Sequence, residues 1–195
     1  MAPPPIRLWT VAEGDISSLQ VGLKGTMNEL LLKDLAQKTH RGLEGRVRAG
    51  MSGGGLCYGY DLIPGQTGAR RINEAEVVIV RRIFQEYAAG RGPRTIAARL
   101  NEEGVPGSFG RPWRDTTIRG HITRGTGVLN NELYIGRLVW NRLRYLEDPA
   151  SGRRRSRLNG SERLIVEEVP DLRIVDDELW AAVKARQTSI RESGA

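Results

Sequence analysis

Arginine is the residue type in this sequence that is best suited to binding chemistry. Lysine and arginine together number 30, and only Lys24, Lys33, Lys38 and Lys184 are lysine. A guanidinium group donates hydrogen bonds in a planar fork that matches the oxygens of a phosphate and the acceptors on a guanine edge. The composition and the formal net charge of +7 therefore favour a polyanionic partner, although a genome rich in G and C also favours arginine codons.

The positive charge is concentrated in the middle and later part of the chain. Residues 91–125 hold seven arginines against three acidic residues, a net charge of +4. Residues 137–163 hold eight arginines against three acidic residues, a net charge of +5. Residues 164–195 hold four basic and seven acidic residues, a net charge of −3. A polyanion is therefore expected to bind along the two basic segments.

Other kinds of reactive side chain are scarce. Cys57 is the one cysteine, which excludes an internal disulfide and a cysteine-based zinc cluster, and we expect it to be a small buried hydrophobe. The glycines at 53–55 are not followed by Gly-Lys-Ser/Thr, so they indicate a linker and not a phosphate-binding loop. No apolar run approaches the roughly 20 residues of a membrane span, and residues 1–5 do not resemble a signal peptide. We expect no metal, no cofactor and no membrane partner.

A long helix is predicted near the N-terminus, over residues 16–49, with Asp15 as its cap and Gly50 as its stop. Apolar residues recur three or four positions apart along it and form one stripe: Leu19, Leu23, Met27, Leu30, Leu31 and Leu35. The stripe is equally compatible with a core helix and with a dimerisation helix that continues towards the polyanion. The second possibility is favoured by three arginines near the end of the helix: Arg41, Arg46 and Arg48.

A second domain is expected to begin at residue 51 with the glycine-rich linker and a short strand. Its first helix spans about residues 73–89, with Asn73 as N-cap and Glu76 in capping-box spacing. Glycines end that helix, and Pro93 opens a second helix that Gly104 ends. Apolar residues at helical spacing are expected to be buried in the two helices: Val77, Val80, Phe84, Tyr87, Ile96, Ala97 and Leu100.

A third helix is predicted after Trp113, with Ile118 and Ile122 inside. Two short helices with apolar faces and basic flanks, joined by a glycine-containing turn, are typical of a helix-turn-helix. In this interpretation residues 94–100 form the supporting helix and residues 114–121 the recognition helix. The gap between them is longer than the usual tight turn, which favours a winged variant. The side chains expected to face a DNA groove are Thr116, Thr117, Arg119 and His121.

The rest of the chain is predicted to contain a basic loop between two strands. Residues 142–163 include Pro149, Gly152 and three successive arginines, which indicates a loop or flap. The other expected elements are a short helical segment over 128–134, strands over 135–141 and 164–169, a helix over 176–187 and a frayed end over 190–195.

Several stretches of the sequence follow one known family pattern. They are residues 13–16, 22–28, 35–42, 53–60 (Gly-Gly-Gly-Leu-Cys-Tyr-Gly-Tyr), 96–101, Trp113, 129–142 (Leu-Asn-Asn-Glu-Leu-Tyr-Ile-Gly-Arg-Leu-Val-Trp-Asn-Arg) and 170–180. Together they resemble the large serine recombinases, the resolvase and invertase superfamily with an appended recombinase domain. The resemblance covers nearly the whole chain, and residues 134–142 and the glycine-rich linker are its most specific parts.

The resemblance implies a serine nucleophile that attacks a DNA phosphodiester and forms a phosphoserine link before strand exchange. The family carries that serine in a Tyr-x-Arg-x-Ser motif, which this sequence lacks; neither Ser17 nor Ser18 has an arginine two residues before it. The family also has an Arg-Thr pair whose arginine joins the active site, and the matching pair here is Lys38-Thr39. We therefore expect no complete catalytic centre, with Lys38 as a residual active-site candidate, and no zinc-ribbon cysteines.

These interpretations combine into one hypothesis. The fold class is mostly α with short β elements, a long N-terminal helix followed by a helix-turn-helix or winged-type recombinase DNA-binding domain. Residues 1–50 are the C-terminal remnant of the catalytic domain, residues 51–145 are the DNA-binding domain, and residues 146–195 are a basic loop and a segment leading towards an absent zinc ribbon. The function is binding of duplex DNA as part of a site-specific serine recombinase. The alternative is a stand-alone DNA-binding regulator or an inactive partner of an intact recombinase.

The expected partner is double-stranded DNA, and a homo- or hetero-oligomer through residues 16–35 is also expected. The expected location is the cytoplasm, in association with the nucleoid. The residues expected to contact DNA are Arg41, Arg46, Arg48, Arg94, Arg114, Thr116, Thr117, Arg119, His121, Arg124, Arg137, Arg142, Arg153, Arg154 and Arg155.

Overall fold

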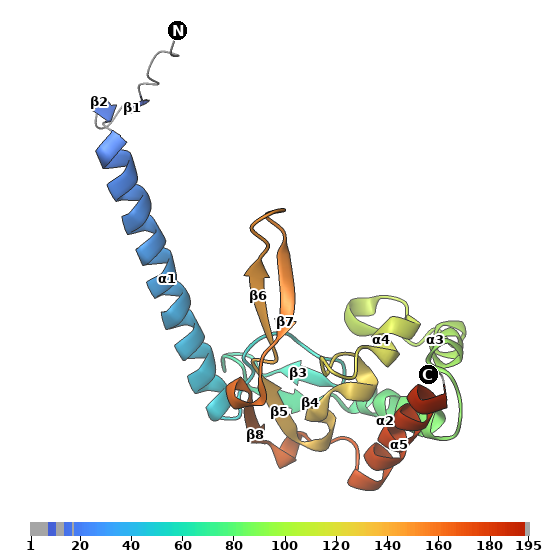
Figure 1. Ribbon diagram of the computed structural model, residues 1–195. Helices are drawn as coiled ribbons and strands as arrows, with labels where there is room; N and C mark the ends of the chain where they lie inside the picture. Colours follow the sequence, from blue (N-terminus) through green and yellow to red (C-terminus); the bar gives the residue numbers. More distant parts are fainter. Residues whose placement is uncertain (1–7, 11–13, 17, 194–195) are drawn as a thin grey trace. The chain divides into compact units, whose positions relative to one another are not determined.

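The computed structural model describes residues 8–10, 14–16 and 18–193 of the chain, and the side chains of residues 22–193. The fold is mostly α-helical with short strands, as the sequence predicts. Figure 1 shows the order of these elements. The chain divides into two compact units, unit 1 (residues 1–42) and unit 2 (residues 43–195).

Unit 1 contains a two-stranded hairpin and most of the long helix. Strands β1 (Leu8–Thr10) and β2 (Gly14–Ile16) pair antiparallel. Helix α1 (Ser18–Arg48) runs from unit 1 into the start of unit 2. Asp15 lies in β2 and does not cap α1, so that expectation is wrong. The reason is that Asp15 pairs within the β1–β2 ladder, opposite Trp9, before the helix begins.

The apolar stripe of α1 is exposed. The residues of the stripe whose side chains are described are each 50–61% exposed: Leu23, Met27, Leu30, Leu31 and Leu35. The side chain of Leu19 lies outside the described residues. Two ion pairs join successive turns of the helix, Glu29 with Lys33 at 2.7 Å and Asp34 with Lys38 at 2.8 Å. Among the described residues, therefore, no other surface covers the stripe.

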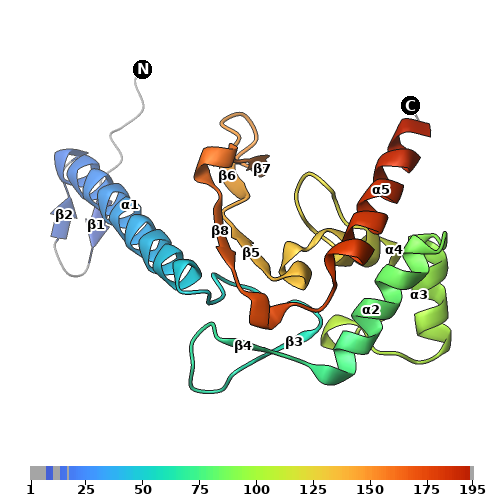
Figure 2. The same ribbon diagram turned by 90° about the horizontal axis from the view of Figure 1, so that it is seen from below.

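Unit 2 has one hydrophobic core, built largely by the helices α2 (Glu74–Ala88), α3 (Pro93–Glu102), α4 (Asp115–Arg119) and α5 (Asp177–Ser193). Helix α2 packs against α5, as Figure 2 shows, and the rings of Phe84 and Trp180 stack with centroids 5.8 Å apart. The apolar positions predicted on α2 and α3 are all buried: Val77, Val80, Phe84, Tyr87, Ile96, Ala97 and Leu100. Burial of each of the large ones contributes roughly 1.5–3 kcal/mol to folding.

Asn73 caps the start of α2 as predicted, but the Glu76 side chain does not bond back to Asn73. The side-chain oxygen of Asn73 accepts from the backbone N–H groups of Ala75 and Glu76, both at 3.1 Å. The Glu76 carboxylate does not close a capping box on Asn73 and accepts instead from the N–H of Gly59 at 2.6 Å. This bond attaches the end of the glycine-rich linker to the first turn of α2.

The strands of unit 2 form three antiparallel pairs. They are β3 (Tyr60–Leu62) with β4 (Arg70–Ile72), β5 (Arg137–Trp140) with β8 (Ile165–Glu168), and β6 (Leu143–Glu147) with β7 (Arg154–Leu158). Because β5 pairs with β8, the β6–β7 hairpin is an insertion between two paired strands, and in Figure 1 it extends away from the helices of unit 2. The short 3-10 helices are Ser108–Gly110, Val128–Asn130, Glu132–Ile135, Ser161–Arg163 and Pro170–Leu172.

Three further sequence predictions are wrong. Residues 142–163 are not a loop, because most of them form the β6–β7 ladder and its turn. The third helix ends at Arg119, because Gly120 has a φ of 54° and a ψ of −147°, and Ile122 beyond it is 48% exposed and not buried. The C-terminal end is not frayed over its described part, because α5 continues through Ile190 to Ser193.

Candidate nucleic-acid interface

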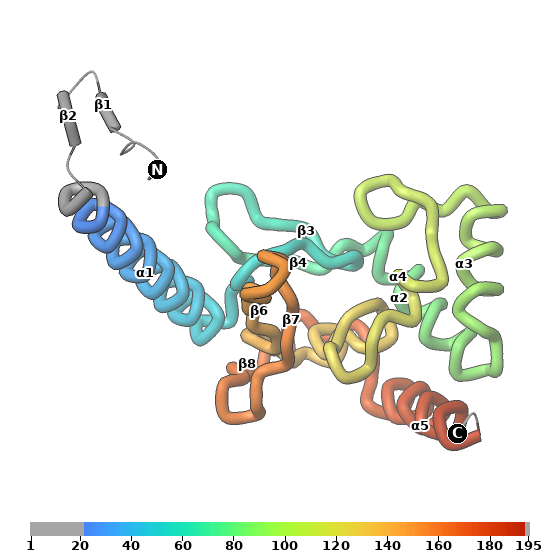
Figure 3. Tube along the Cα trace, turned by 45° about the horizontal axis from the view of Figure 1, so that its top comes forward, coloured from blue at the N-terminus to red at the C-terminus, as the bar shows by residue number. Residues whose placement is uncertain are grey.

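Helices α3 and α4 pack together through short apolar faces. Ile118 is the buried residue of α4, and Ile96, Ala97 and Leu100 are the buried residues of α3. Figure 3 shows α3, the connecting loop and α4 following one another along one edge of unit 2. Since one face of each helix is buried, their other faces are turned to solvent.

The loop between α3 and α4 is anchored at Trp113. The side-chain amide of Asn101 donates to the carbonyl of Trp113 at 2.9 Å, and its oxygen accepts from the N–H of Trp113 at 2.7 Å. Tyr58 packs edge-on against the buried Trp113 ring, with centroids 4.8 Å apart. The start of α4 therefore has a defined position relative to the end of α3.

The predicted groove-facing side chains are turned to solvent on α4 and, for His121, in the turn after it. Thr116, Thr117, Arg119 and His121 are all exposed. Arg119 forms a 3.7 Å ion pair with Asp115, one turn earlier, and an exposed pair of this kind contributes little. The helix has only five residues, so it is about 7.5 Å long. The surface that it offers is correspondingly short, and the turn after it contributes the neighbouring side chains.

The turn after α4 requires glycine and brings Arg124 beside the helix. His121 and Thr126 bond to each other through both backbone groups, at 3.1 and 3.2 Å, which closes the turn that carries Arg124. A Cβ on Gly120 would lie 1.7 Å from the carbonyl oxygen of Thr126. This close approach, together with the positive φ of Gly120, explains why the helix cannot continue past Arg119.

A buried amide fixes this turn to the last helix, and the sequence analysis did not identify it. Asn130 is 3% exposed and donates to the carbonyls of Arg119 at 2.7 Å and Thr126 at 2.9 Å. Its side-chain oxygen accepts from Lys184 and Gln187 of α5, both at 3.0 Å. Burial lowers the pKa of Lys184 to about 8. The end of α4 is thus held by a network that spans unit 2, and only its position in the Leu129–Arg142 stretch pointed to Asn130.

Many arginines of unit 2 are used for internal contacts. Glu86, which is buried, pairs with Arg82 at 2.9 Å and with Arg91 at 3.2 Å. Burial is the largest single influence on the pKa of Glu86 and raises it. The hydrogen bonds and charges of the neighbouring arginines together outweigh burial and lower the pKa. Arg186 of α5 donates to backbone carbonyls at the end of α2 and lies 4.3 Å over the ring of Tyr87. These guanidinium groups stabilise the packing of the helices and are not available to a ligand.

Arg137 and Arg142, which are also predicted DNA contacts, are in internal pairs. Arg137 lies 2.7 Å from Glu132 and 3.4 Å from Glu168, and Arg142 bonds to the other oxygen of Glu132. Both are half-buried. Their pairing ties β5 to the 3-10 helix before it, and their contact with DNA stays a prediction.

A second group of arginines is exposed and has no hydrogen-bond or ion-pair partner among the described residues. Seven of them lie on two elements of unit 2, the α3–α4 region and the β6–β7 hairpin: Arg94, Arg111, Arg114, Arg124, Arg144, Arg153 and Arg157. In the view of Figure 1, the hairpin and α4 lie above α2 and α5. The guanidinium groups without internal partners are thus concentrated on these two elements.

The hairpin places two of these arginines directly opposite each other. In the β6–β7 register Arg144 faces Arg157, and both are exposed. Like charges at directly opposed positions destabilise a strand pair. On the same hairpin Arg154 lies 5.3 Å over the ring of Tyr145, and Arg155 pairs with Asp148 at 2.9 Å. An anionic ligand beside Arg144 and Arg157 would reduce the repulsion between their guanidinium groups.

The remaining predicted residues lie on α1. Arg41 and Arg48 are exposed, and Arg46 is half-buried. Arg48 pairs with Glu44 at 2.9 Å, and Lys38 pairs with Asp34 as described above. Arg41 and Lys38 belong to unit 1, whereas Arg46 and Arg48 belong to unit 2.

The glycine-rich linker is held in place, which the sequence did not indicate. Arg70 of β4 donates to the hydroxyl of Ser52 at 2.6 Å and to the carbonyl of Gly55. A hollow of about 390 Å³ lies between the linker and the α4 region, and Thr117 and Trp140 are among the residues that line it. The linker therefore forms one wall beside α4 and is not a free connection.

The described residues contain no other obvious centre of chemistry. No group of three or more His, Cys, Asp or Glu side chains among them is placed to hold a metal ion. Cys57 is half-buried, and burial raises the pKa of its thiol. Of the helices in the described part of the chain, none is both long and apolar enough to cross a membrane.

Comparison with known proteins gives one family match. A family model described as Recombinase matches residues 74–189, more than half of the chain. Among solved structures, the chain is similar to one described as "Crystal Structure of a LSR-DNA Complex", with 17% sequence identity and a TM-score of 0.49. That match covers 77% of this chain and 39% of the other, so this chain spans well under two thirds of its length. A search of the curated proteins gives no match.

Proposed function

Because this chain belongs to the Recombinase family, we propose that it binds duplex DNA as part of a site-specific serine recombinase. In the intact protein, a serine outside residues 1–195 attacks the DNA phosphodiester and forms the phosphoserine link. This chain supplies the surface that holds the DNA, and by itself it does not cut or join strands. A nicking and strand-exchange assay of the chain alone tests the last point, and recombination in that assay would contradict it.

The observation that carries the proposal is the separation of paired from unpaired arginines. Three of the four arginines of α2 and α5 bond to acidic side chains or backbone carbonyls, namely Arg81, Arg82 and Arg186. The fourth, Arg191 near the end of α5, is exposed and has no such partner among the described residues. The α3–α4 region and the β6–β7 hairpin keep seven exposed guanidinium groups without internal partners. Clustering of unneutralised arginine destabilises a free protein and is offset when a phosphate backbone neutralises it. This distribution supports a polyanion as the ligand of these two elements.

Within this surface, α3 and α4 act as a helix-turn-helix with a short recognition helix. Thr116, Thr117 and Arg119 are exposed and lie off the face of the helix that buries Ile118. Arginine bridges two acceptors of guanine, and threonine contacts a thymine methyl or a phosphate. Arg94 and Arg114, at the starts of α3 and α4, bind phosphates on either side and position the helix.

The proposed domain organisation assigns a role to each part of the chain. Residues 1–50 are the end of the catalytic domain, and the DNA-binding domain begins at residue 51. The sequence-predicted boundary after residue 145 falls within β6, and α5 packs against α2 in the same core, so we assign the β6–β7 hairpin and α5 to the DNA-binding domain. The end of the segment predicted over residues 146–195 leads towards a zinc ribbon. The exposed stripe of α1 pairs with a second copy of this chain. We place the protein in the cytoplasm on nucleoid DNA and regard a mobile element as its source.

The test is a salt titration of binding to a 30-base-pair duplex of random sequence. If each of the seven arginines neutralises one phosphate, log K falls with log salt with a slope of about −6. A slope near zero would refute DNA binding by this surface. Selection of a preferred site from a random library then separates specific from non-specific binding.

The exposed stripe of α1 also supports a second candidate function. In that case the chain is a regulator that forms inactive mixed dimers with an intact recombinase. A pull-down of the chain with tagged recombinase distinguishes this function from the first. An unchanged monomeric mass after mixing the two proteins would count against it.

A further inference from the structure

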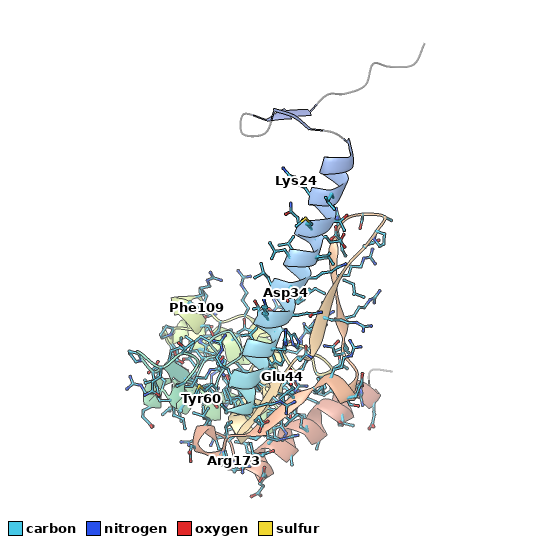
Figure 4. The ribbon with its side chains drawn as sticks, turned by 90° about the vertical axis from the view of Figure 1, so that its left-hand side faces the viewer. Lys24, Asp34, Glu44, Tyr60, Phe109 and Arg173 are labelled. Atoms are coloured by element: carbon cyan, nitrogen blue, oxygen red, sulfur yellow. The ribbon has the colours of Figure 1, made fainter. Side chains whose placement is uncertain are left out.

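Phe109, in the loop between α3 and α4, is both conformationally unusual and exposed. It is 76% exposed, the highest value among the large hydrophobic residues for which the structure describes side chains. Its φ of 57° and ψ of 31° place it in the left-handed region, which a bulky aromatic residue rarely occupies. Figure 4 labels Phe109 on this loop. An aromatic ring that is kept exposed on a strained backbone indicates a functional contact.

Backbone hydrogen bonds and a required glycine fix the conformation of the loop that carries Phe109. The N–H of Gly107 donates to the carbonyl of Arg111 at 3.0 Å, and the N–H of Gly110 donates to the carbonyl of Gly107 at 3.0 Å. A Cβ on Gly107 would lie 2.6 Å from the Arg111 carbonyl oxygen, so the loop closes only with glycine there. Its base is anchored because the hydroxyl of Tyr58 donates to the carbonyl of Pro106 at 3.1 Å. The ring is therefore presented from a closed and anchored turn.

The surroundings of Phe109 combine an apolar tip with positive charge. The ring lines a hollow of about 400 Å³ together with Arg111, Trp113, Arg114 and Thr117. Arg111 and Arg114 are two of the arginines without a partner among the described residues. A ligand that suits this pattern carries negative charge next to flat apolar groups. Duplex DNA has both, because phosphates flank the stacked bases.

We propose that Phe109 is an apolar wedge that inserts its ring at a base step of the bound duplex and partly unstacks it, while Arg111 and Arg114 hold the flanking phosphates. Aromatic and aliphatic side chains of DNA-bending proteins enter base steps in this way. This proposal rests on the proposed DNA binding. It adds a second mode of recognition, in which affinity depends on how easily the DNA base step under Phe109 is deformed. Steps that unstack readily, such as TA and CA, are then favoured beneath the loop.

The experiment uses the full chain and a duplex selected by the wild type from a random library, with 2-aminopurine placed at each position in turn. Unstacking raises the fluorescence of this base analogue at one step. The Phe109→Ala variant should lose that signal and bind about tenfold more weakly, the order of a lost base–aromatic contact. Its salt slope should be unchanged, because no phosphate contact is removed. The matched control is Val78→Ala on α2, an apolar residue that is 61% exposed, and it should behave as wild type.

A folding defect is excluded with Phe109→Gly. Glycine adopts a φ of 57° without a steric conflict, so this variant should melt no lower than wild type and still lose the fluorescence signal. Unchanged affinity of Phe109→Ala would overturn the wedge. The wedge would also be overturned if Phe109→Ala bound more weakly but the wild type caused no change in 2-aminopurine fluorescence. That result would favour a contact of Phe109 with a thymine methyl group. Failure of the wild type to bind any duplex would instead refute the proposed function itself, and the salt titration identifies that case.

Discussion

The opposed arginines of the β6–β7 hairpin lead to a prediction in which stability and DNA binding change in opposite directions. The perturbation is the double variant Arg144→Gln/Arg157→Gln. In the free protein the two guanidinium groups lie directly across the strand pair without an acidic partner among the described residues. Their removal relieves a like-charge pair, and we expect the free energy of unfolding to rise by about 0.2–1 kcal/mol. For a unit of this size, that is an increase in Tm of about 1–3 °C.

The effect on DNA binding has the opposite sign and follows from counting phosphates. Each neutralised phosphate contributes about −0.9 to the slope of log K against log salt. Loss of two contacts should therefore make the slope less steep by about 2. Between 50 and 200 mM salt, the fall in affinity should be about tenfold smaller than for the wild type. Fluorescence anisotropy with a labelled 30-base-pair duplex measures both slopes.

A matched control removes the same amount of charge from internal pairs. In Arg91→Gln/Arg173→Gln, both arginines have acidic partners, Glu86 and Asp177. This control should keep the wild-type slope and lose stability. An unchanged slope in the hairpin variant, or a loss of stability there, would refute the assignment of the hairpin to DNA binding.

Three other predictions concern α4 and the network behind it. Asn130→Ala leaves several buried polar groups without partners, and thermal denaturation should show a loss of about 3 kcal/mol; a loss below 1 kcal/mol would mean that water replaces the amide. Burial holds the pKa of Lys184 at about 8, below its ordinary 10.5, so the folded state releases the proton first and stability rises with pH between those values. The unfolding free energy of the wild type minus that of Lys184→Met should therefore increase from pH 8 to 10.5, and a flat difference would contradict the shift. Arg119→Gln should relax the preference at one base pair of a selected site at a cost of about 1–3 kcal/mol, whereas a uniform loss across sequences would make Arg119 a phosphate contact.

The sequence by itself predicted the features of the fold that depend on neighbouring residues. Asn73 caps α2, Pro93 opens α3 and Gly50 follows the end of α1, because caps and stops depend on the conformation of one or two residues. The burial of Ile96 and Leu100 follows from helical spacing in the same way. The excess of arginine over residues 91–163 was likewise visible in the chain, and it identified the region but not the groups available to a ligand.

The β6–β7 hairpin and the short α4 required the tertiary structure. Pro149, Gly152 and the arginine run indicated a loop, while the strands on either side are formed by pairing with each other and contain few of the apolar residues that predict a strand. Helix α4 stops early because Gly120 must approach the backbone of Thr126. Both results depend on contacts that hydrophobic spacing does not encode.

Tertiary structure also decided which arginines are available to bind. Arg142 bonds to Glu132, ten positions earlier, Arg82 bonds to Glu103, 21 positions later, and Arg186 caps a helix 96 positions before it. Arg144 and Arg157 are brought together by strand register and left without an acidic partner among the described residues. An arginine binds a ligand only when the fold supplies no closer acceptor. The charge of each segment is therefore a property of the sequence, and its availability is a property of the packed structure.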